Sequence, residues 1–65
     1  MHRYRVYFMQ GRSIIAAEVI EAPNHGEAAQ SAVRGLAEYP WARTLVPTGL
    51  EVWRGHTLHQ SAALA

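Results

Sequence analysis

The first third of the chain alternates between polar and apolar residues in a way that is typical of β-strands. Residues 3–9 (RYRVYFM) are rich in aromatic and β-branched types, and residues 14–22 (IIAAEVIEA) form a second such run. Between the two runs, Gly11 stands at the first central position of a two-residue type II′ turn, which favours glycine because that position needs a positive φ. The turn predicts a hairpin whose register places Arg5 opposite Glu18, and the opposite charges of this pair support that register.

The next periodic segment predicts a single helix over residues 25–38. Its apolar positions recur at the i, i+3 and i+4 spacing of one buried stripe, at 28, 29, 32, 33, 36 and 37. Asn24 is a good N-cap residue, and Glu27 three positions later completes a capping-box pattern. Most of the stripe is alanine, so the helix can lie close to a sheet. Pro40 ends it.

The last third predicts a second hairpin after an apolar connection at residues 39–48. In the segment 49–59 (GLEVWRGHTLH), a turn at Arg54-Gly55 separates two short strands. The predicted fold is therefore α+β with two layers and the order ββαβ(β). An antiparallel sheet of three or four strands has one helix across one face. We expect a single domain over residues 1–59 and a flexible tail over residues 60–65.

The two faces of the first predicted hairpin are both partly apolar. The face expected to form the core consists of Tyr4, Val6, Phe8, Ile15, Ala17 and Val19. The opposite face consists of Arg3, Arg5, Tyr7, Met9, Ile14, Ala16, Glu18 and Ile20. In the second hairpin, Trp53 and Leu58 share the side opposite Leu50 and Val52. One helix covers only one face, so the apolar positions exceed the cover that the chain provides.

Four explanations are compatible with this surplus, because soluble monomers rarely leave a large contiguous apolar surface open. The 39–48 connection with Trp41 and Leu45 folds under the sheet, or the register differs by one residue. Otherwise a second copy of the chain pairs through this face or through an edge of the sheet, or a different protein covers the face. We expect a homodimer, with Trp53 as an anchor because tryptophan is enriched at interface hot spots. The expected interface residues are Tyr7, Met9, Ile14, Ile20, Trp41 and Trp53.

Composition narrows the class of protein without indicating a reaction. The 65 residues include no cysteine and have a formal net charge of +1 with the four histidines neutral, and the charged residues are all glutamate or arginine. The absence of cysteine excludes disulfides and thiolate metal sites. The first residues lack the long apolar run of a signal peptide, and no stretch approaches the ~20 apolar residues of a membrane span. We therefore expect a soluble, cytoplasmic protein without a membrane partner.

The candidate chemical groups do not assemble into a known catalytic or metal-binding pattern. His56 and His59 form an H-x-x-H sequence, but on a strand the two side chains point to opposite faces. No serine lies in a nucleophile-elbow sequence, and no glycine-rich phosphate loop is present. We expect a protein that is not an enzyme, with no catalytic residue, cofactor or metal.

Binding of single-stranded nucleic acid is the alternative function. Arg3, Arg5, Tyr7 and Arg54 combine arginines with an aromatic side chain, and such a sheet can stack unpaired bases. The near-zero net charge argues against this alternative, because phosphate binding depends on accumulated positive charge.

The pattern YRVYF…GR…AAEVIEA…EAAQSAVRGLA…LEVWRG resembles a group of short uncharacterised alphaproteobacterial proteins that are common in rhizobia. The resemblance covers most of residues 3–55 and implies the ββαβ(β) order, but no activity, catalytic residue or cofactor. This chain departs from the group in its longer connection at 39–48. The matching positions are Tyr4, Tyr7, Phe8, Gly11, Glu21, Ala22, Glu27, Ala28, Glu51, Val52, Trp53 and Gly55.

Overall fold

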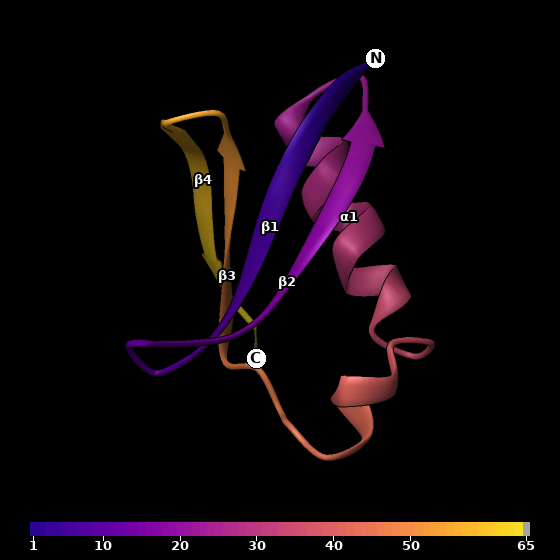
Figure 1. The fold of residues 1–65 in the computed structure, drawn as a ribbon, viewed down its shortest axis with the longest axis vertical. Helices are drawn as coiled ribbons and strands as arrows, with labels where there is room; N and C mark the ends of the chain where they lie inside the picture. Colours follow the sequence, from indigo (N-terminus) through magenta and orange to yellow (C-terminus); the bar gives the residue numbers. More distant parts are fainter. Residues whose placement is uncertain (65) are drawn as a thin grey trace.

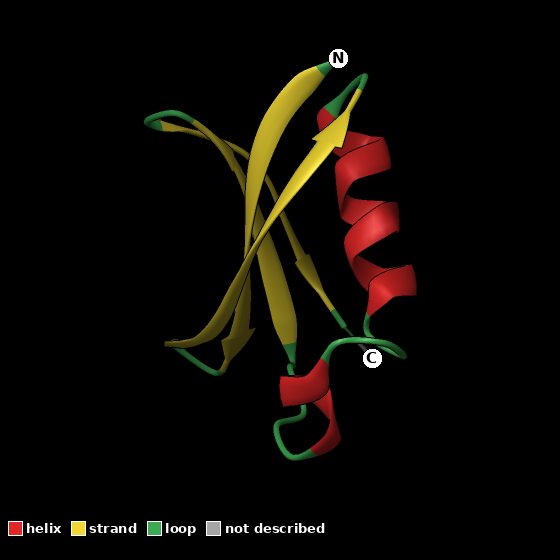
Figure 2. Ribbon diagram, turned by 45° about the vertical axis from the view of Figure 1, so that its right-hand side comes forward, coloured by secondary structure: helices red, strands yellow, loops and turns green. Residues whose placement is uncertain are grey.

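The computed structural model describes residues 1–64, which form one antiparallel sheet and one α-helix. The strands lie side by side in the order β2-β1-β3-β4, and α1 lies across one face of the sheet (Figures 1 and 2). This arrangement confirms the predicted two-layer α+β fold. In chain order the elements are β1 (His2–Gln10), β2 (Ser13–Ala22), α1 (His25–Gly35), the 3-10 helix η1 (Pro40–Arg43), β3 (Gly49–Arg54) and β4 (Thr57–Ala63).

The core lies between α1 and the two central strands. Phe8, Val6 and Val52 are the largest fully buried side chains, and they come from β1 and β3. The helix contributes the buried alanines of the predicted stripe, Ala28, Ala29 and Ala32. Small side chains let the helix backbone approach the sheet closely, so the strands supply most of the apolar volume.

The first hairpin has the predicted turn but a different register. Gly11 has a φ of 61° and Arg12 has no positive φ, which is the type II′ pattern. Met9 pairs with Ile14 as expected, but Phe8 pairs with Ala16, so Ile15 has no partner of its own. This β-bulge inserts one residue into β2 and shifts every later pair by one position.

The bulge makes the predicted Arg5–Glu18 pair wrong. Arg5 instead lies opposite Val19, and Glu18 lies opposite Val6 on the helix side of the sheet. Val19 was expected in the core, but it points away from it and is 58% exposed. Ile20 was expected on the outer face, but it packs against the core. A one-residue shift has this effect because successive strand residues point to opposite faces.

The second hairpin also has a register that differs from the predicted one. Its turn is Gly55-His56 rather than Arg54-Gly55, because Arg54 pairs with Thr57. Gly55 has a φ of 60°, so its place in the turn matches that of Gly11 in the first hairpin. A second bulge follows, and β4 continues to Ala63.

The tail expected over residues 60–65 is therefore wrong for residues 60–63, which form the second half of β4. The backbone N–H of Leu64 then donates to the carbonyl of Thr48 at 2.9 Å. The domain extends beyond residue 59 because these residues pair with β3. Ala65 lies outside the described residues.

The helix begins as predicted and ends earlier. The side-chain oxygen of Asn24 accepts from the backbone N–H of Glu27 at 2.9 Å, which confirms the N-cap. The helix ends at Gly35 rather than residue 38. A Cβ at Gly35 would lie 2.5 Å from Cζ of Tyr39, so the absence of a side chain makes room for that ring.

The 39–48 connection packs on the same side of the sheet as α1. Trp41 lies against Phe8, with ring centroids 4.9 Å apart, and stacks on Tyr39 at 5.7 Å. Its indole N–H donates to Oε2 of Glu18 at 3.2 Å, a contact that exists because the bulge turned Glu18 to this side. Burial, together with the negative charges of Glu18 and Glu38, raises the pKa of Tyr39 above its ordinary value. The connection therefore extends the core and does not cover the second face.

Candidate interaction face

The face of the sheet that points away from α1 is called the open face. Within residues 1–64, both α1 and η1 pack on the opposite side, so no segment covers it. Three of its apolar side chains are strongly exposed: Ile14 at 57%, Val19 at 58% and Leu58 at 44%. The open face consists of Arg3, Arg5, Tyr7, Met9, Ile14, Ala17, Val19, Glu21, Glu51, Trp53, Leu58 and Ser61.

Four side chains form the centre of the open face. Arg5 lies opposite Trp53, and Tyr7 lies opposite Glu51, on the neighbouring strands β1 and β3. The Tyr7 and Trp53 rings meet edge to face, with centroids 6.5 Å apart and planes at 78°.

The polar atoms of this central group have partners within the group. The indole N–H of Trp53 donates to Oε1 of Glu51 at 3.2 Å. Nη1 of Arg5 donates to the hydroxyl of Tyr7 at 3.4 Å. The group therefore presents half-buried aromatic rings whose polar ends are already hydrogen-bonded.

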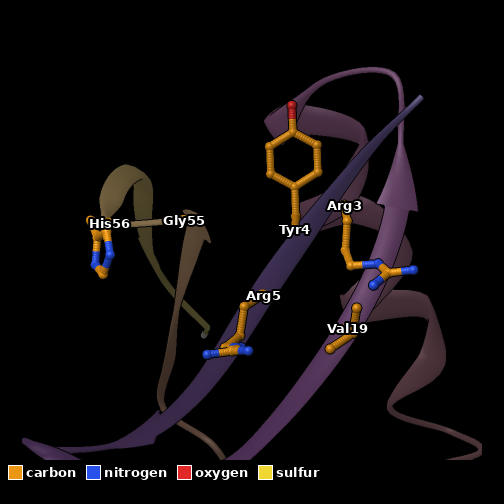
Figure 3. Close-up of a pocket in the computed structure, with 6 residues that line it drawn as sticks. All are labelled: Arg3, Tyr4, Arg5, Val19, Gly55 and His56. Atoms are coloured by element: carbon orange, nitrogen blue, oxygen red, sulfur yellow. The ribbon is translucent and has the colours of Figure 1, made fainter.

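A recess of about 280 Å³ lies at one corner of the sheet, beside the β3–β4 turn (Figure 3). Its two arginines diverge: Arg3 extends toward Val19 on β2, whereas the guanidinium of Arg5 lies toward β3. Diverging guanidinium groups do not provide the convergent, bidentate donors with which arginine grips a phosphate or carboxylate. The lining residues are Arg3, Tyr4, Arg5, Val19, Gly55 and His56.

A second recess of about 360 Å³ lies over the central group of the open face. It contains one arginine and one glutamate, so its walls have no strong excess of either charge. Both recesses include Gly55 and His56 in their walls, because the β3–β4 turn rises on the open side of the sheet. The lining residues are Arg5, Tyr7, Ile14, Glu51, Trp53, Gly55 and His56.

Four of the six expected interface residues lie on the open face, and two do not. Tyr7, Met9, Ile14 and Trp53 share it. Ile20 and Trp41 are wrong as members of this face, because both pack against the core on the helix side. The bulge in β2 turns Ile20 toward the helix side, and the 39–48 connection places Trp41 against Phe8 on that side.

Val19 belongs to the open face and was not expected there. The sequence contained a signal for the shifted register, because that register places Arg3 opposite Glu21, a second pair of opposite charges. It also turns Ile20 toward the core. The Arg5–Glu18 match was equally attractive on charge alone, so charge could not decide between the two registers.

The residues of the nucleic-acid alternative do not share one face. Arg3, Arg5 and Tyr7 lie on the open face, but Arg54 follows Trp53 directly and belongs to the other side by strand alternation. Two glutamates share the open face with Arg3, Arg5 and Tyr7: Glu21 lies opposite Arg3, and Glu51 lies opposite Tyr7. The open face therefore contains two arginines and two glutamates.

The histidines occupy two separate places. His56 lies in the β3–β4 turn beside the open face, whereas His59 lies on the helix side, where it stacks on His25 with ring centroids 5.4 Å apart. Nδ1 of His25 is 2.9 Å from Oε1 of Gln60. In the described part of the chain, no three histidine or carboxylate side chains converge on a point where a metal ion would bind.

The comparisons with known proteins find no relative. No protein-family model matches the chain, and neither the curated proteins nor the solved structures give a match. Among residues 1–64, no helix has the length and apolar character that crossing a membrane requires.

Proposed function

We propose that the protein is a small, non-enzymatic interaction module that forms a homodimer through its open face. The observation that supports this proposal is the one-sided cover of the sheet. The helix, η1 and both aromatic side chains of the connection lie on one side, while Tyr7, Trp53 and three exposed aliphatic residues lie on the other. In this proposal the protein acts in the cytoplasm by association.

The surface area is adequate for a stable interface. A standard interface takes about 800 Å² from each partner. The chain exposes 4454 Å², so such an interface uses roughly a fifth of its surface. Complete burial of a Val, Ile or Leu side chain is worth about 1.5–3 kcal/mol. Ile14, Val19 and Leu58 and their copies therefore contribute several kcal/mol.

The charges on the open face favour a second copy over a nucleic acid. Its two arginines are balanced by Glu21 and Glu51, and Glu51 lies in the centre, bonded to Trp53. A carboxylate in the middle of an aromatic platform repels a phosphate backbone. Equal numbers of both signs instead allow two copies to meet without an excess of either charge in the interface. Binding of single-stranded nucleic acid is therefore the weaker candidate.

Sedimentation equilibrium tests the proposal, over about 1–100 µM, the range in which a complex of −6 to −8 kcal/mol dissociates. We expect a dimer. Val19→Arg, on the open face, should weaken dimerisation at least about a hundredfold, because two buried charges replace two apolar contacts.

Val33→Arg is the matched control, because Val33 is 42% exposed on the helix and lies away from the open face. It should leave the dimer intact. A wild-type chain that is monomeric throughout this range refutes the homodimer and leaves a different protein as the occupant. A dimer that Val33→Arg dissociates and Val19→Arg does not would show that the interface lies elsewhere.

A further inference from the structure

The strand register arranges the open face in rows that cross all four strands. Arg5 lies opposite Val19 on one side and Trp53 on the other, and Trp53 lies opposite Leu58. One row therefore runs Val19–Arg5–Trp53–Leu58 from edge to edge. The next row runs Ala17–Tyr7–Glu51–Ser61.

Each of these two rows complements its own reversal. When the first row is laid on a reversed copy of itself, Val19 meets Leu58 and Arg5 meets Trp53. The first contact joins two exposed aliphatic side chains, and the second places a guanidinium on an indole, the aromatic ring that binds cations best. In the second row, Ala17 meets Ser61, which are both small, and the Tyr7 hydroxyl approaches the Glu51 carboxylate.

We infer that two copies pack open face to open face about a twofold axis. The axis lies midway between the two sheets, runs parallel to the strands and passes over the boundary between β1 and β3. This inference rests on the proposed homodimer and specifies how its two copies meet. The rotation places β1 of one protomer over β3 of its partner, and β2 over β4, so that every row meets its reversal. The interface is isologous: each contact occurs twice, as a closed dimer requires.

An axis across the strands gives poorer contacts. If it passes through the first row, each residue meets its own copy, and Arg5 lies on Arg5. If it passes between the two rows, Leu58 meets Ser61 and Val19 meets Ala17, so large apolar side chains face small ones. In these two rows, the strand-parallel axis matches like-sized apolar groups and separates the like charges.

The shape of the sheet is compatible with this packing. The turns of both hairpins lie at diagonally opposite corners and rise on the side away from α1 (Figures 1 and 2). The other two corners recede, as in any twisted sheet. A half-turn about the strand direction places each rising corner over a receding corner of the partner, so the two surfaces nest, with the strands aligned within about 30°.

Cysteine cross-linking tests the axis, and the natural chain has no cysteine to interfere. Val19→Cys and Leu58→Cys change exposed side chains on the two edge strands. With sheets about 10 Å apart and strands about 4.8 Å apart, position 19 of one copy lies about 10 Å from position 58 of its partner. It lies about 17 Å from the partner's own position 19. A bis-maleimide with a span of about 10 Å distinguishes these distances.

We expect a mixture of the two single-cysteine chains, one of them mass-labelled, to give cross-linked mixed dimers. Their yield should be at least about fivefold higher than the yield of cross-linked dimers from either variant by itself. A mixture of Val19→Cys with Val33→Cys is the control and should give none, because position 33 lies on α1 on the other side of the sheet. Self-cross-linking of Val19→Cys in excess would overturn the inferred axis.

Absence of cross-links in variants that still sediment as dimers would also overturn the axis, while the homodimer itself would stand. If the wild-type chain sediments as a monomer, the proposed function fails instead. The two failures are therefore distinguishable.

Discussion

Substitution of Gly35 by alanine tests whether the aromatic packing at the end of α1 controls the stability of the fold. In an exposed helix, this change stabilises by up to about 1 kcal/mol, because glycine is a poor helix former. Here an added Cβ would lie 2.5 Å from both Cζ and the hydroxyl oxygen of Tyr39. That ring cannot move freely, because it stacks on Trp41 and meets Phe8 edge to face.

The magnitude follows from these two opposing effects. Forcing extra volume into a packed site costs about 1–3 kcal/mol. Subtraction of the helix-propensity gain leaves a net loss of about 1 kcal/mol in the free energy of unfolding, or roughly 4–8 °C in the melting temperature of a domain of this size. The sign is therefore opposite to that expected for an ordinary helical glycine.

A double-mutant cycle with Tyr39→Ala separates the clash from the helix propensity. Without the ring, Gly35→Ala should become stabilising by up to about 1 kcal/mol, and the coupling between the two sites should be about 2 kcal/mol. Urea unfolding followed by tryptophan fluorescence measures all four variants, at one protein concentration because a dimer's stability depends on concentration. If Gly35→Ala stabilises the wild-type background, the packing argument is refuted.

Three further measurements test other parts of the structure. Asn24→Ala should lower the free energy of unfolding by about 1 kcal/mol, because the N–H of Glu27 loses its acceptor; an unchanged urea midpoint would contradict the N-cap. Tyr39 ionises near pH 10.0 in the unfolded chain, and its pKa is higher in the folded protein. The free energy of unfolding should therefore fall as the pH rises above 10.0 and stop falling once the folded pKa is passed. Thermal melts at several pH values should show this fall and Tyr39→Phe should reduce it, whereas an identical pH dependence in both proteins would refute it. Finally, titration with a short single-stranded oligonucleotide at low salt should leave the tryptophan fluorescence unchanged, and a salt-sensitive quench would instead support nucleic-acid binding.

Local signals in the sequence were sufficient for most of the elements. Gly11 identified the first turn and its type, and Asn24 identified the start of the helix. The alanine stripe identified the face of the helix that is buried. These features depend on residues within a few positions of one another, and their physical basis is the backbone conformation or capping bond that each residue favours.

One of the two expected interface residues that lie on the other face, Ile20, was displaced by a single inserted residue. The bulge at Ile15 exchanged Val19 and Ile20 between the two faces, although both hairpin strands and the turn between them were predicted correctly. Two charge pairs, Arg5–Glu18 and Arg3–Glu21, supported two different registers. The packing of Ile20 against the core and of Glu18 against Trp41 distinguishes them, and both contacts involve segments distant in the chain.

The sequence by itself determined the order of strands and helix along the chain, the turn glycine of the first hairpin, the cap of the helix and the small side chains that let the helix lie on the sheet. Only the tertiary structure decided the register beyond each bulge, the side that Trp41 covers and the addition of residues 60–63 to the sheet. The reason is that a strand has nearly the same local energy in either of two adjacent registers. The choice depends on which register buries more apolar area against segments that the chain brings together only when it folds.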